Sequence, residues 1–483
     1  MERLLDYVII AAYLIGIAVF GVLSGGKQKS VKDYFLGSDS VPWWAVCFAI
    51  VAAETSTLTF ISIPGLAYLT NLNFLQLTIG YLLGRVVVAY FFLPSYFKGE
   101  LNTAYAFLEE RFGTKTRRFA SVVFLFTRTA ADGVRLFATA IPLKLLLDIN
   151  YPTAIIIIAI ISLGYTVTGG VKGIIWVDVI QMFTYIAGAI LAGIILIGLL
   201  PNGLDTLFNA AIADDKFNMI NWGFDKGIGG FFAQPYTLIG GILGGAFLSM
   251  ASHGTDQLIV QRLLTTKSLK NAKKAIITSG VVVIFQFAIF LIVGVALYAY
   301  YGHIDVKSDE IFPKFIIEKL PVGISGFIIA GLFAAALSTL AGSISSLSSS
   351  TMLDLYKPMF GKNLSPEREL KISRYITFIW AGLLVCAAIL FMESPAAVVE
   401  LALSIASFTY GGLLGTFILG LINKKAKQED ALAGFTAGIF VMITVISLKL
   451  VAWTWFTLVG VITTVAVGSI LAALSDRKQG VTK

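Results

Sequence analysis

Two adjacent hydroxyl residues, Ser338 and Thr339, lie within a long apolar stretch that spans roughly residues 315–354. Hydroxyls in such a helix can bond back to the carbonyl one turn earlier. They can also serve as neutral oxygen ligands for a hard cation, which prefers oxygen donors. The pair alone favours the first interpretation, so a second feature is needed to favour a cation site.

That second feature is the stretch from Ala52 to Gly65, which interrupts another apolar segment. It contains one carboxylate, five hydroxyls, a proline and a glycine. These residues predict a broken helix. Unwound carbonyls and hydroxyls that face each other near the bilayer midplane are how secondary transporters hold a coupling ion. Together the two stretches predict a cation site built from neutral oxygens.

A cluster of charges marks a third candidate region. Arg128, Asp132 and Arg135 stand at i, i+4 and i+7, so they share one face of a helix. Intramembrane charges are costly and indicate function by default. Two arginines around one aspartate leave the face net positive, so either an anionic substrate group or Glu54 would complete the balance. A closed ion-pair network that only fixes helix packing is the alternative.

Glu54 and Arg85 are further charges near the middle of apolar segments. Glu54 could couple protons, tune cation affinity or pair with an arginine, and the last is favoured. Arg85 either joins the charged network or extends its side chain to a membrane interface.

Composition bounds the fold class. Hydrophobic residues make up 57% of the chain and charged residues 13%, and apolar runs of about 20 residues recur throughout. Only helices or closed barrels satisfy their backbone in lipid, and these runs are too long for barrel strands. The sequence therefore predicts an all-α integral membrane protein with about thirteen transmembrane helices. The segments are 5–25, 42–66, 73–97, 118–148, 152–169, 174–200, 231–255, 273–301, 315–353, 371–393, 397–422, 429–450 and 453–475.

The net charge of +8 is not interpreted as nucleic-acid binding. Most lysines and arginines fall in loops after odd-numbered segments or in the C-terminal tail, which the positive-inside rule assigns to the cytoplasm. An odd number of segments then places the N-terminus outside and the C-terminus inside. The outer loop around residues 200–230 is either a gate or a solvated loop.

Segments two to six (42–200) and seven to eleven (231–422) form two sets of five. An odd number of helices per set inverts one set relative to the other, as in many transporters. One helix (5–25) precedes this core and two (429–475) follow it, so residues 1–483 are interpreted as a single transmembrane domain.

Four motifs resemble the solute:sodium symporter family. They are Lys32 to Gly37 with Val41 to Ala45, Thr168 to Gln181, Asp256 to Ser268, and Phe333 to Ser343 with Asp354 to Tyr356. Their order along the chain makes chance matches improbable. The resemblance implies a LeuT-like five-plus-five inverted-repeat core, with one extra helix before it and two after.

The resemblance also implies a sodium site made of carbonyl and hydroxyl oxygens from the first and eighth core helices. Its ligands here would be Ala52, Thr55, Ala335, Ser338 and Thr339. Neutral oxygens suit a monovalent ion that must bind and leave. Sodium is then the coupling ion, and no organic cofactor is expected.

Some family members hold a further sodium with hydroxyls farther along the same helix. The matching positions here, Ala341 and Gly342, have no side-chain oxygen, so one sodium per cycle is expected. Asp178 in the second motif is either a way-station for sodium leaving the site or a structural partner for a basic group such as Lys172.

The substrate side is compared position by position with the family. Ser56 and Thr59 match substrate-facing positions of sialic-acid-transporting relatives, whose carboxylate-binding arginine falls here at Ala131. Positions that bind sugar in another branch fall on Ser249 and Ser252. His253 is equally consistent with a purely structural, packed role and with contact to the substrate.

We therefore expect sodium-coupled, alternating-access uptake of a small carboxylate-bearing solute: an amino acid, an organic acid or a sialic-acid-like compound. The candidate substrate residues are Ser56, Thr59, Arg128, Asp132, Arg135, Glu54, Ser249 and His253. The expected partners are this solute, sodium and the lipid bilayer; the oligomeric state is left open.

Other functions are less favoured. Proton-coupled transport through Glu54 or Asp132 and sodium/sugar symport are the alternatives. No nucleophile–base pair, His pair or HExxH motif lies in the spans, which disfavours an enzyme. A channel is disfavoured because there is no repeated filter-like loop.

Overall fold

The computed structural model describes residues 3–37, 40–99, 101–147, 149–305, 307–361, 364–392 and 398–481. Over these ranges the chain is almost entirely helical, and the one β-type pairing is an isolated bridge between Val41 and Thr266. The predicted all-α class is confirmed. Lys362 and Lys483 of the charge argument, and the predicted segment ends at 148, 393 and 397, lie outside the described residues.

Nine helical spans in the described ranges are long and apolar enough to cross a membrane. They are α1 (Leu4–Gly25), α5 to α6 (Leu75–Lys98), α9 (Tyr151–Gly198), α11 to α12 (Gly227–Gly254), α14 (Leu269–Tyr301), α16 to α17 (Ile324–Phe360), α18 (Pro366–Leu390), α20 (Gln428–Ser447) and Trp453–Ser475, which includes most of α21 (Phe456–Val481).

A bent pair of helices, α3 and α4, would be a tenth span. Two more long helices are not among the nine: the charge-bearing α8 (Thr114–Leu147), and α19 (Val398–Ile422), whose part Thr409–Ile422 is apolar but shorter than the other spans. Adding them and dividing α9 into two would give thirteen, so that number stays a prediction.

The predicted broken helix is present. α3 (Trp43–Glu54) and α4 are separated by Thr55 and Ser56, which have extended backbone conformations, and the axes bend by 62°. The break precedes Pro64, which lies inside α4 (Thr57–Leu69). Because α3 stops at Glu54, its last carbonyls lose the amide partners that a continuing helix would supply.

The predicted connection between the segments 152–169 and 174–200 is present as a break inside α9. Gly170 has non-helical backbone angles, with φ 57° and ψ −165°, and it separates two helical parts of α9. This left-handed conformation favours glycine, and a Cβ there would lie 2.8 Å from the Tyr34 carbonyl oxygen. The chain therefore turns in place, with α2 (Val31–Leu36) packed directly on the kink.

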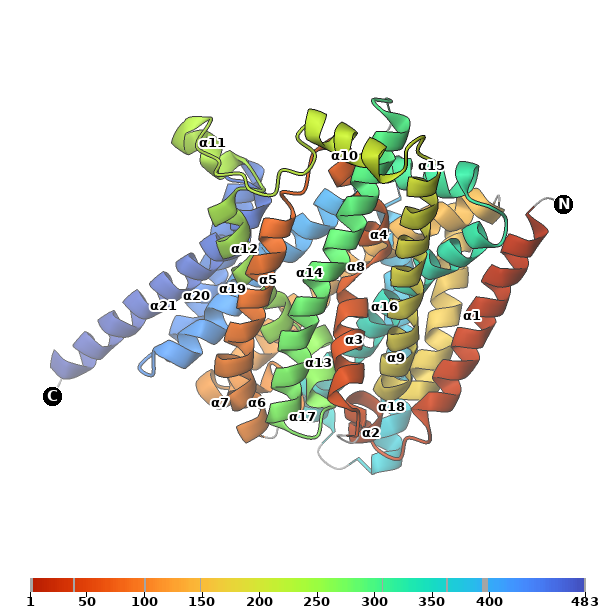
Figure 1. Ribbon diagram of the computed structural model, residues 1–483. Helices are drawn as coiled ribbons and strands as arrows, with labels where there is room; N and C mark the ends of the chain where they lie inside the picture. The colour runs from red at the N-terminus through yellow and green to blue at the C-terminus, as the bar shows by residue number, and fades with distance from the viewer. Residues whose placement is uncertain are drawn as a thin grey trace.

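The short helices lie at the two ends of the bundle. At the lower end of Figure 1 are α2, α7 (Ala106–Phe112) and α17 (Lys357–Phe360); at the upper end are α10 (Leu204–Ala213), α11 (Gly227–Ala233) and α15 (Ser308–Lys319). The loops grouped by charge in the sequence thus share an end of the molecule.

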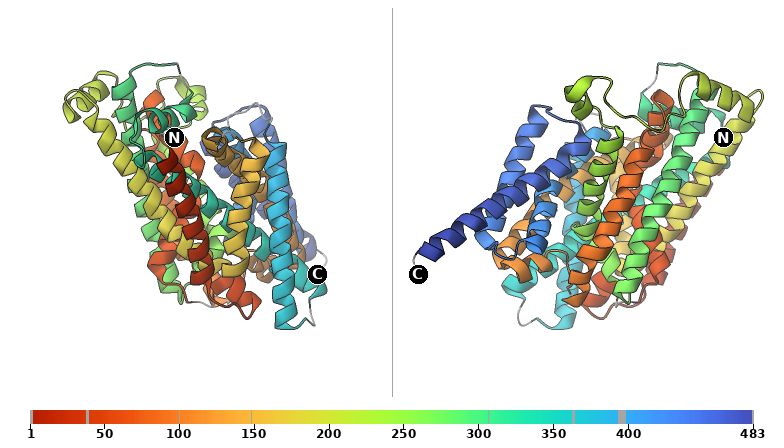
Figure 2. Two further views of the ribbon diagram at one scale, coloured as in Figure 1. Left: turned by 90° about the vertical axis from the view of Figure 1, so that its right-hand side faces the viewer. Right: turned by 60° about the vertical axis from the view of Figure 1, so that its left-hand side comes forward.

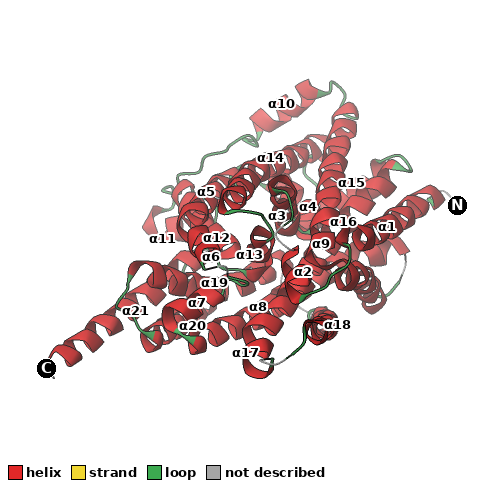
Figure 3. Cartoon of the chain, turned by 90° about the horizontal axis from the view of Figure 1, so that it is seen from below, coloured by secondary structure: helices red, strands yellow, loops and turns green. Residues whose placement is uncertain are grey.

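The bundle is organised around α16 (Ile324–Ser350), most of whose residues are buried. α1 packs against α9 and α16 at one flank, and α21 packs against α19 and α20 at the other (Figures 1 and 2). Seen from below, α1, α2, α9 and α18 gather at the first flank (Figure 3). The polar residues of α16 therefore face protein rather than lipid.

Candidate functional site

The two hydroxyls of α16 have different partners. Thr339 Oγ1 donates to the Ala335 carbonyl at 3.0 Å, which is the local back-bond that a lone hydroxyl favours. Ser338 Oγ instead donates to Asp178 Oδ1 of α9 at 2.6 Å. Both side chains are buried, so this part of α16 carries two neutral oxygens and an acceptor carboxylate one bond away.

The break between α3 and α4 faces the same part of α16. Thr57 Oγ1 donates to the Leu332 carbonyl at 3.2 Å, and a small cavity lies between the break and α16. It has a volume of about 10 Å³ and is lined by Ser56, Thr57, Asp132, Arg135, Leu136, Thr139, Ala336, Thr339 and Leu340. The structure therefore brings the break and the predicted sodium-site helix together.

The predicted sodium ligands Ala52 and Thr55 both lie at the end of α3, across the junction from α16. Ala52 is buried in the last turn of α3, and Thr55 caps that helix. The Thr55 hydroxyl accepts a hydrogen bond from Gln286 Nε2 of α14, and the ligand predicted at this residue is its backbone carbonyl. Thr59 is partly buried in the first turn of α4.

Asp178 has a basic partner, but that partner is not Lys172. Arg262 donates to Asp178 Oδ2 through Nε at 3.2 Å and through Nη2 at 2.9 Å. Arg262 belongs to the third sequence motif, Asp256 to Ser268, in which residues 257–264 form the fully buried helix α13 (Gln257–Leu264). Arg262 therefore does not belong among the solvent-exposed loop cations.

The guanidinium of Arg262 also rests on α16. A Cβ built at Gly342 would lie 2.5 Å from Arg262 Nη2. The absence of a side chain at position 342 is thus what allows the arginine to reach Asp178 at this point.

The charged face of α8 forms as predicted, but it is not net positive. Asp132 pairs with both Arg128 and Arg135, the latter at 3.3 Å, and Ser343 of α16 donates to the same carboxylate. Arg128 Nη1 also lies 3.1 Å from Asp256 Oδ2. Asp256 supplies the second carboxylate, so neither Glu54 nor a substrate is needed for charge balance.

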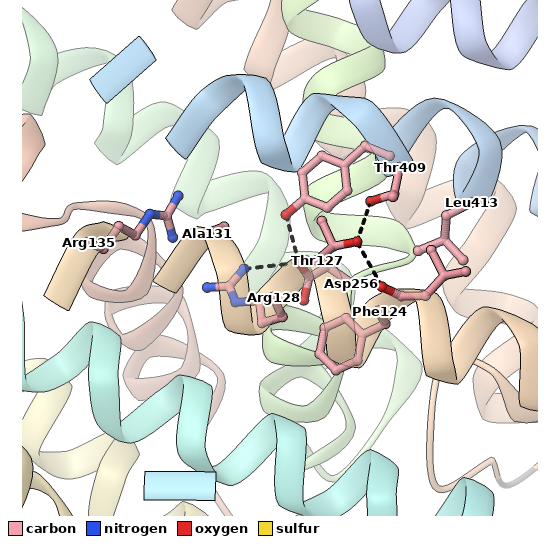
Figure 4. A pocket seen from close by; sticks show the side chains of 10 residues that line it. Phe124, Thr127, Arg128, Ala131, Arg135, Asp256, Thr409 and Leu413 are labelled. Carbon is pink, nitrogen blue, oxygen red and sulfur yellow. Dashed lines mark hydrogen bonds and ion pairs between the residues drawn. The ribbon is translucent and has the colours of Figure 1, made fainter. Parts of the chain in front are cut away.

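Figure 4 shows how this network lies around a second small cavity. Arg128, Thr127 and Arg135 project from α8, Asp256 projects from the turn before α13, and Thr409 belongs to α19. Tyr410 of α19 donates to Asp256 Oδ2 at 2.7 Å. Asp256 therefore connects α8, through Arg128, and α19, through Tyr410, to the start of α13.

Arg135 makes fewer contacts with carboxylates than Arg128, the other arginine of this face. Its side chain is 22% exposed, compared with 6% for Arg128, and its contact with Asp132 is a single long one. It lines both small cavities. Arg135 therefore uses fewer of its donors in ion pairs than Arg128 does.

Glu54 belongs to a different cluster. It pairs with Arg85 of α5 (Leu75–Val87), which is fully buried and also donates to Ser279 Oγ at 3.0 Å. His253 of α12 (Leu238–Gly254) lies 3.7 Å from Glu54 through Nε2, and its Nδ1 shares a hydrogen bond with Ser252. The expected arginine pairing of Glu54 is observed, and Arg85 does not extend to an interface.

Ser249 lies one turn before His253 and is buried. Its Oγ has no hydrogen-bond partner within the described ranges. The candidate substrate residues thus separate into two groups, one around Arg135 and one around Glu54.

Two of the residues that complete these networks were missed. Asp256 and Arg262 were visible only as members of a polar motif whose charges are typical of a loop. A useful signal was the spacing of apolar residues within that motif, which the buried helix α13 explains.

An all-helical bundle with a broken helix facing a hydroxyl-bearing helix is the arrangement of a secondary transporter. A profile of the sodium:solute symporter family matches residues 34–438. The chain belongs to this family.

Similar proteins agree on the class. The sodium/sialic acid symporter NanT of Aliivibrio fischeri is 30% identical, over 97% of this chain and 93% of that protein. The sodium/sialic acid symporter SiaT of Proteus mirabilis is 29% identical, over 97% of this chain and 95% of that one. The human sodium-coupled monocarboxylate transporter 1 is 29% identical over 90% of this chain and 72% of that protein.

Solved structures show the same fold. A substrate-bound, outward-open sodium-coupled sialic acid symporter superposes with a TM-score of 0.87 at 28% identity, covering 98% of both chains. The transporter Mhp1 in a closed conformation superposes with a TM-score of 0.59 at 13% identity, covering 92% of this chain and 94% of that one, which shows the fold alone.

The chain is thus a multi-pass membrane protein with a LeuT-like fold and a sodium-coupled solute symporter. The prediction of a transporter rather than an enzyme is confirmed. Sodium is its coupling ion.

Proposed function

We propose that the chain carries a small organic carboxylate into the cell with one sodium ion, and that Arg135 binds the substrate carboxylate. The observation that carries this proposal is the partial exposure of Arg135 at two cavities, with one long contact to Asp132. Relatives transport sialic acids and monocarboxylates, both of which present a carboxylate. The position of the relatives' carboxylate-binding arginine is occupied here by Ala131, which has no guanidinium. Arg135 lies one turn farther along α8.

The sodium ion would bind at the junction of the broken helix and α16. The proposed ligands are the carbonyls of Ala52, Thr55 and Ala335 and the hydroxyls of Ser338 and Thr339. Asp178 lies one hydrogen bond from Ser338 and would receive the ion as it leaves toward the cytoplasm. Proton-coupled transport through Glu54 or Asp132 is less favoured, because both carboxylates form ion pairs with arginines.

A stoichiometry of one sodium follows from the next turns of α16. Ala341 and Gly342 provide no side-chain oxygen, and the guanidinium of Arg262 lies against Gly342. The positive charge of Arg262 against Gly342 disfavours a second cation bound at positions 341 and 342.

Substrate binding requires movement. The cavities around Arg135 are about 10 Å³ each, which is room for about one water molecule. The contacts of α4 and α8 with α16 must therefore open on one face to admit a solute, with Ser56 and Thr59 exposed by the same motion. Sodium and substrate would strengthen each other's binding by equal factors.

The proposed topology places the N-terminus outside and the C-terminus in the cytoplasm, across the cell membrane. The short helices α2, α7 and α17, whose loops carry most of the basic residues, lie at one end of the bundle (Figure 1). We assign this end to the cytoplasm. Residues 42–200 and 231–422 would be the two inverted repeats.

The dependence of uptake on sodium, on the solute offered and on the membrane potential tests the stoichiometry and the substrate class together. We would measure uptake of N-acetylneuraminate, lactate and neutral sugars into proteoliposomes under a sodium gradient, with the membrane potential clamped by potassium and valinomycin. One sodium with one monocarboxylate carries no net charge, so uptake should need sodium and ignore the potential. Uptake driven by a proton gradient without sodium, or restricted to sugars, would refute the proposal; a steep dependence on potential would refute the stoichiometry.

A further inference from the structure

A basic cavity lies at the lower end of the bundle, away from the transport site. Its volume is about 420 Å³, and it is lined by Gly26, Lys27, Gln28, Lys29, Val167, Thr168 and Arg374. These residues come from the end of α1 and the segment after it, from α9 just before its kink, and from α18. Figure 3 shows these helices together with α2 at one flank.

The lining of this cavity carries an excess of positive charge. Three of its lining residues are cationic and none is acidic. No ion pair joins Lys27, Lys29 or Arg374 to a carboxylate in the part of the chain that the structure describes. One carboxylate lies nearby, since Asp33 Oδ2 accepts the backbone amide of Lys29 at 3.0 Å, so the three cations outnumber it.

Arg374 is built into the wall of the cavity. Its Nη2 donates to Gln28 Oε1 at 3.3 Å, while its Nε is buried without a hydrogen-bond partner among the described residues. Gln28 is itself fixed, because its Nε2 donates to the Gly26 carbonyl. A buried guanidinium donor that lacks an acceptor costs free energy, so an incoming acceptor would be stabilising.

The helices that frame the cavity face lipid. Leu23 of α1 is 74% exposed, and Tyr375 and Phe378 of α18 are 59% and 53% exposed. Both helices are candidate membrane spans. The cavity thus lies where charged headgroups meet apolar chains, and basic pockets between transmembrane helices at this level suit phosphate headgroups.

From these observations we infer a binding site for the phosphate of an anionic membrane lipid. The phosphate oxygens would accept from Arg374, Lys27 and Lys29, and the acyl chains would lie against the apolar faces of α1 and α18. Phosphate fits better than a single carboxylate, because its oxygens can satisfy donors on several sides at once. The site would couple lipid composition to α1 and α18, outside the proposed transport cavity.

Native mass spectrometry of the full-length, delipidated protein tests the site. The titrants are dioleoyl phosphatidylglycerol, dioleoyl phosphatidylcholine and soluble glycerol 3-phosphate. The test variant is Lys27→Gln/Lys29→Gln/Arg374→Gln, and the control is Lys267→Gln/Lys270→Gln/Lys424→Gln, which removes the same charge from exposed lysines of other loops predicted on the same side.

We expect wild type and control to bind phosphatidylglycerol in preference to phosphatidylcholine. The test variant should bind it roughly 100-fold more weakly, at about fivefold for each cation removed. Arg374→Gln alone should cost about fivefold, which keeps the test decisive if the triple variant does not fold.

Three results would overturn the inference. They are unchanged phosphatidylglycerol affinity in the test variant and in Arg374→Gln, equal weakening in the control, or equal affinity for phosphatidylcholine. Glycerol 3-phosphate binding as tight as phosphatidylglycerol would overturn the lipid assignment and indicate a soluble phosphate compound instead.

Discussion

Arg262 and Arg135 both pair with an aspartate beside α16, yet their surroundings differ. The side chain of Arg262 is 3% exposed and donates to Asp178 through two nitrogens and to the Leu258 carbonyl through a third. Arg135 is 22% exposed and makes one long contact with Asp132. A guanidinium whose donors are used by the protein fixes the architecture, whereas one with free donors at a cavity can bind a ligand. The position of an arginine near the site is therefore a weaker guide than its unused donors.

The largest expected effect on stability comes from replacing Arg262, whose donors are used by the protein. Arg262→Gln leaves Asp178 buried without its charged partner, and such changes destabilise by about 3–5 kcal/mol. We expect a clear drop in the thermal unfolding temperature of the detergent-purified protein and a lower yield. Adding Asp178→Asn to Arg262→Gln should restore part of the loss, because no unpaired charge then remains. Equal destabilisation by Arg135→Gln would contradict the assignment of a structural role to Arg262 and a binding role to Arg135.

Arg135→Gln should act on binding instead. Loss of a charge-assisted hydrogen bond costs about 1.5–3 kcal/mol, so the affinity for the carboxylate substrate should fall roughly 10- to 100-fold, with the unfolding temperature nearly unchanged. Isothermal titration at saturating sodium measures this directly. Lys144→Gln is the matched control, since Lys144 is a cation of the same helix that lies outside both cavities. If Arg135→Gln binds substrate normally, the carboxylate site lies elsewhere.

The hydroxyls of α16 should give a smaller, ion-specific effect. Ser338→Ala and Thr339→Ala each remove one proposed sodium ligand. We expect each change to weaken sodium binding by about 1 kcal/mol, the net value of a hydrogen bond. The sodium concentration for half-maximal uptake should then rise roughly fivefold. Ser338→Ala should cost more of the two, because Ser338 also donates to Asp178. Ser62→Ala, a hydroxyl of α4 outside the cavity, is the control. A sodium dependence that matches wild type in both variants would remove these residues from the ion site.

The sequence predicted the helical class, the broken helix and the shared face of Arg128, Asp132 and Arg135, because each depends on the periodicity and composition of nearby residues. It did not predict the partners of those residues. Asp256 and Arg262 meet α8, α9 and α16 only after a polar motif folds into the buried helix α13, and long-range pairing of this kind leaves no local pattern. The expected positive face was wrong for this reason, and so was Lys172 as the partner of Asp178.

Lys216, in the segment after α10, is a buried cation with no ion pair to a carboxylate in the described part of the chain. Its Nζ donates to the Tyr68 carbonyl at the end of α4 at 2.7 Å and lies 4.0 Å from the centre of the Tyr298 ring. Burial lowers the pKa of Lys216, and Asp214 only partly opposes this shift. Protonation is therefore harder in the folded than in the unfolded protein, so the stability contributed at Lys216 is lowest below its folded pKa and rises as the pH approaches the unfolded value of about 10.4. The unfolding free energy of wild type relative to Lys216→Met should increase over this alkaline window, as measured by denaturant titration at several pH values. A difference that falls with increasing pH would mean that the charged form of Lys216 is stabilised in the folded protein, as Arg262 is by Asp178.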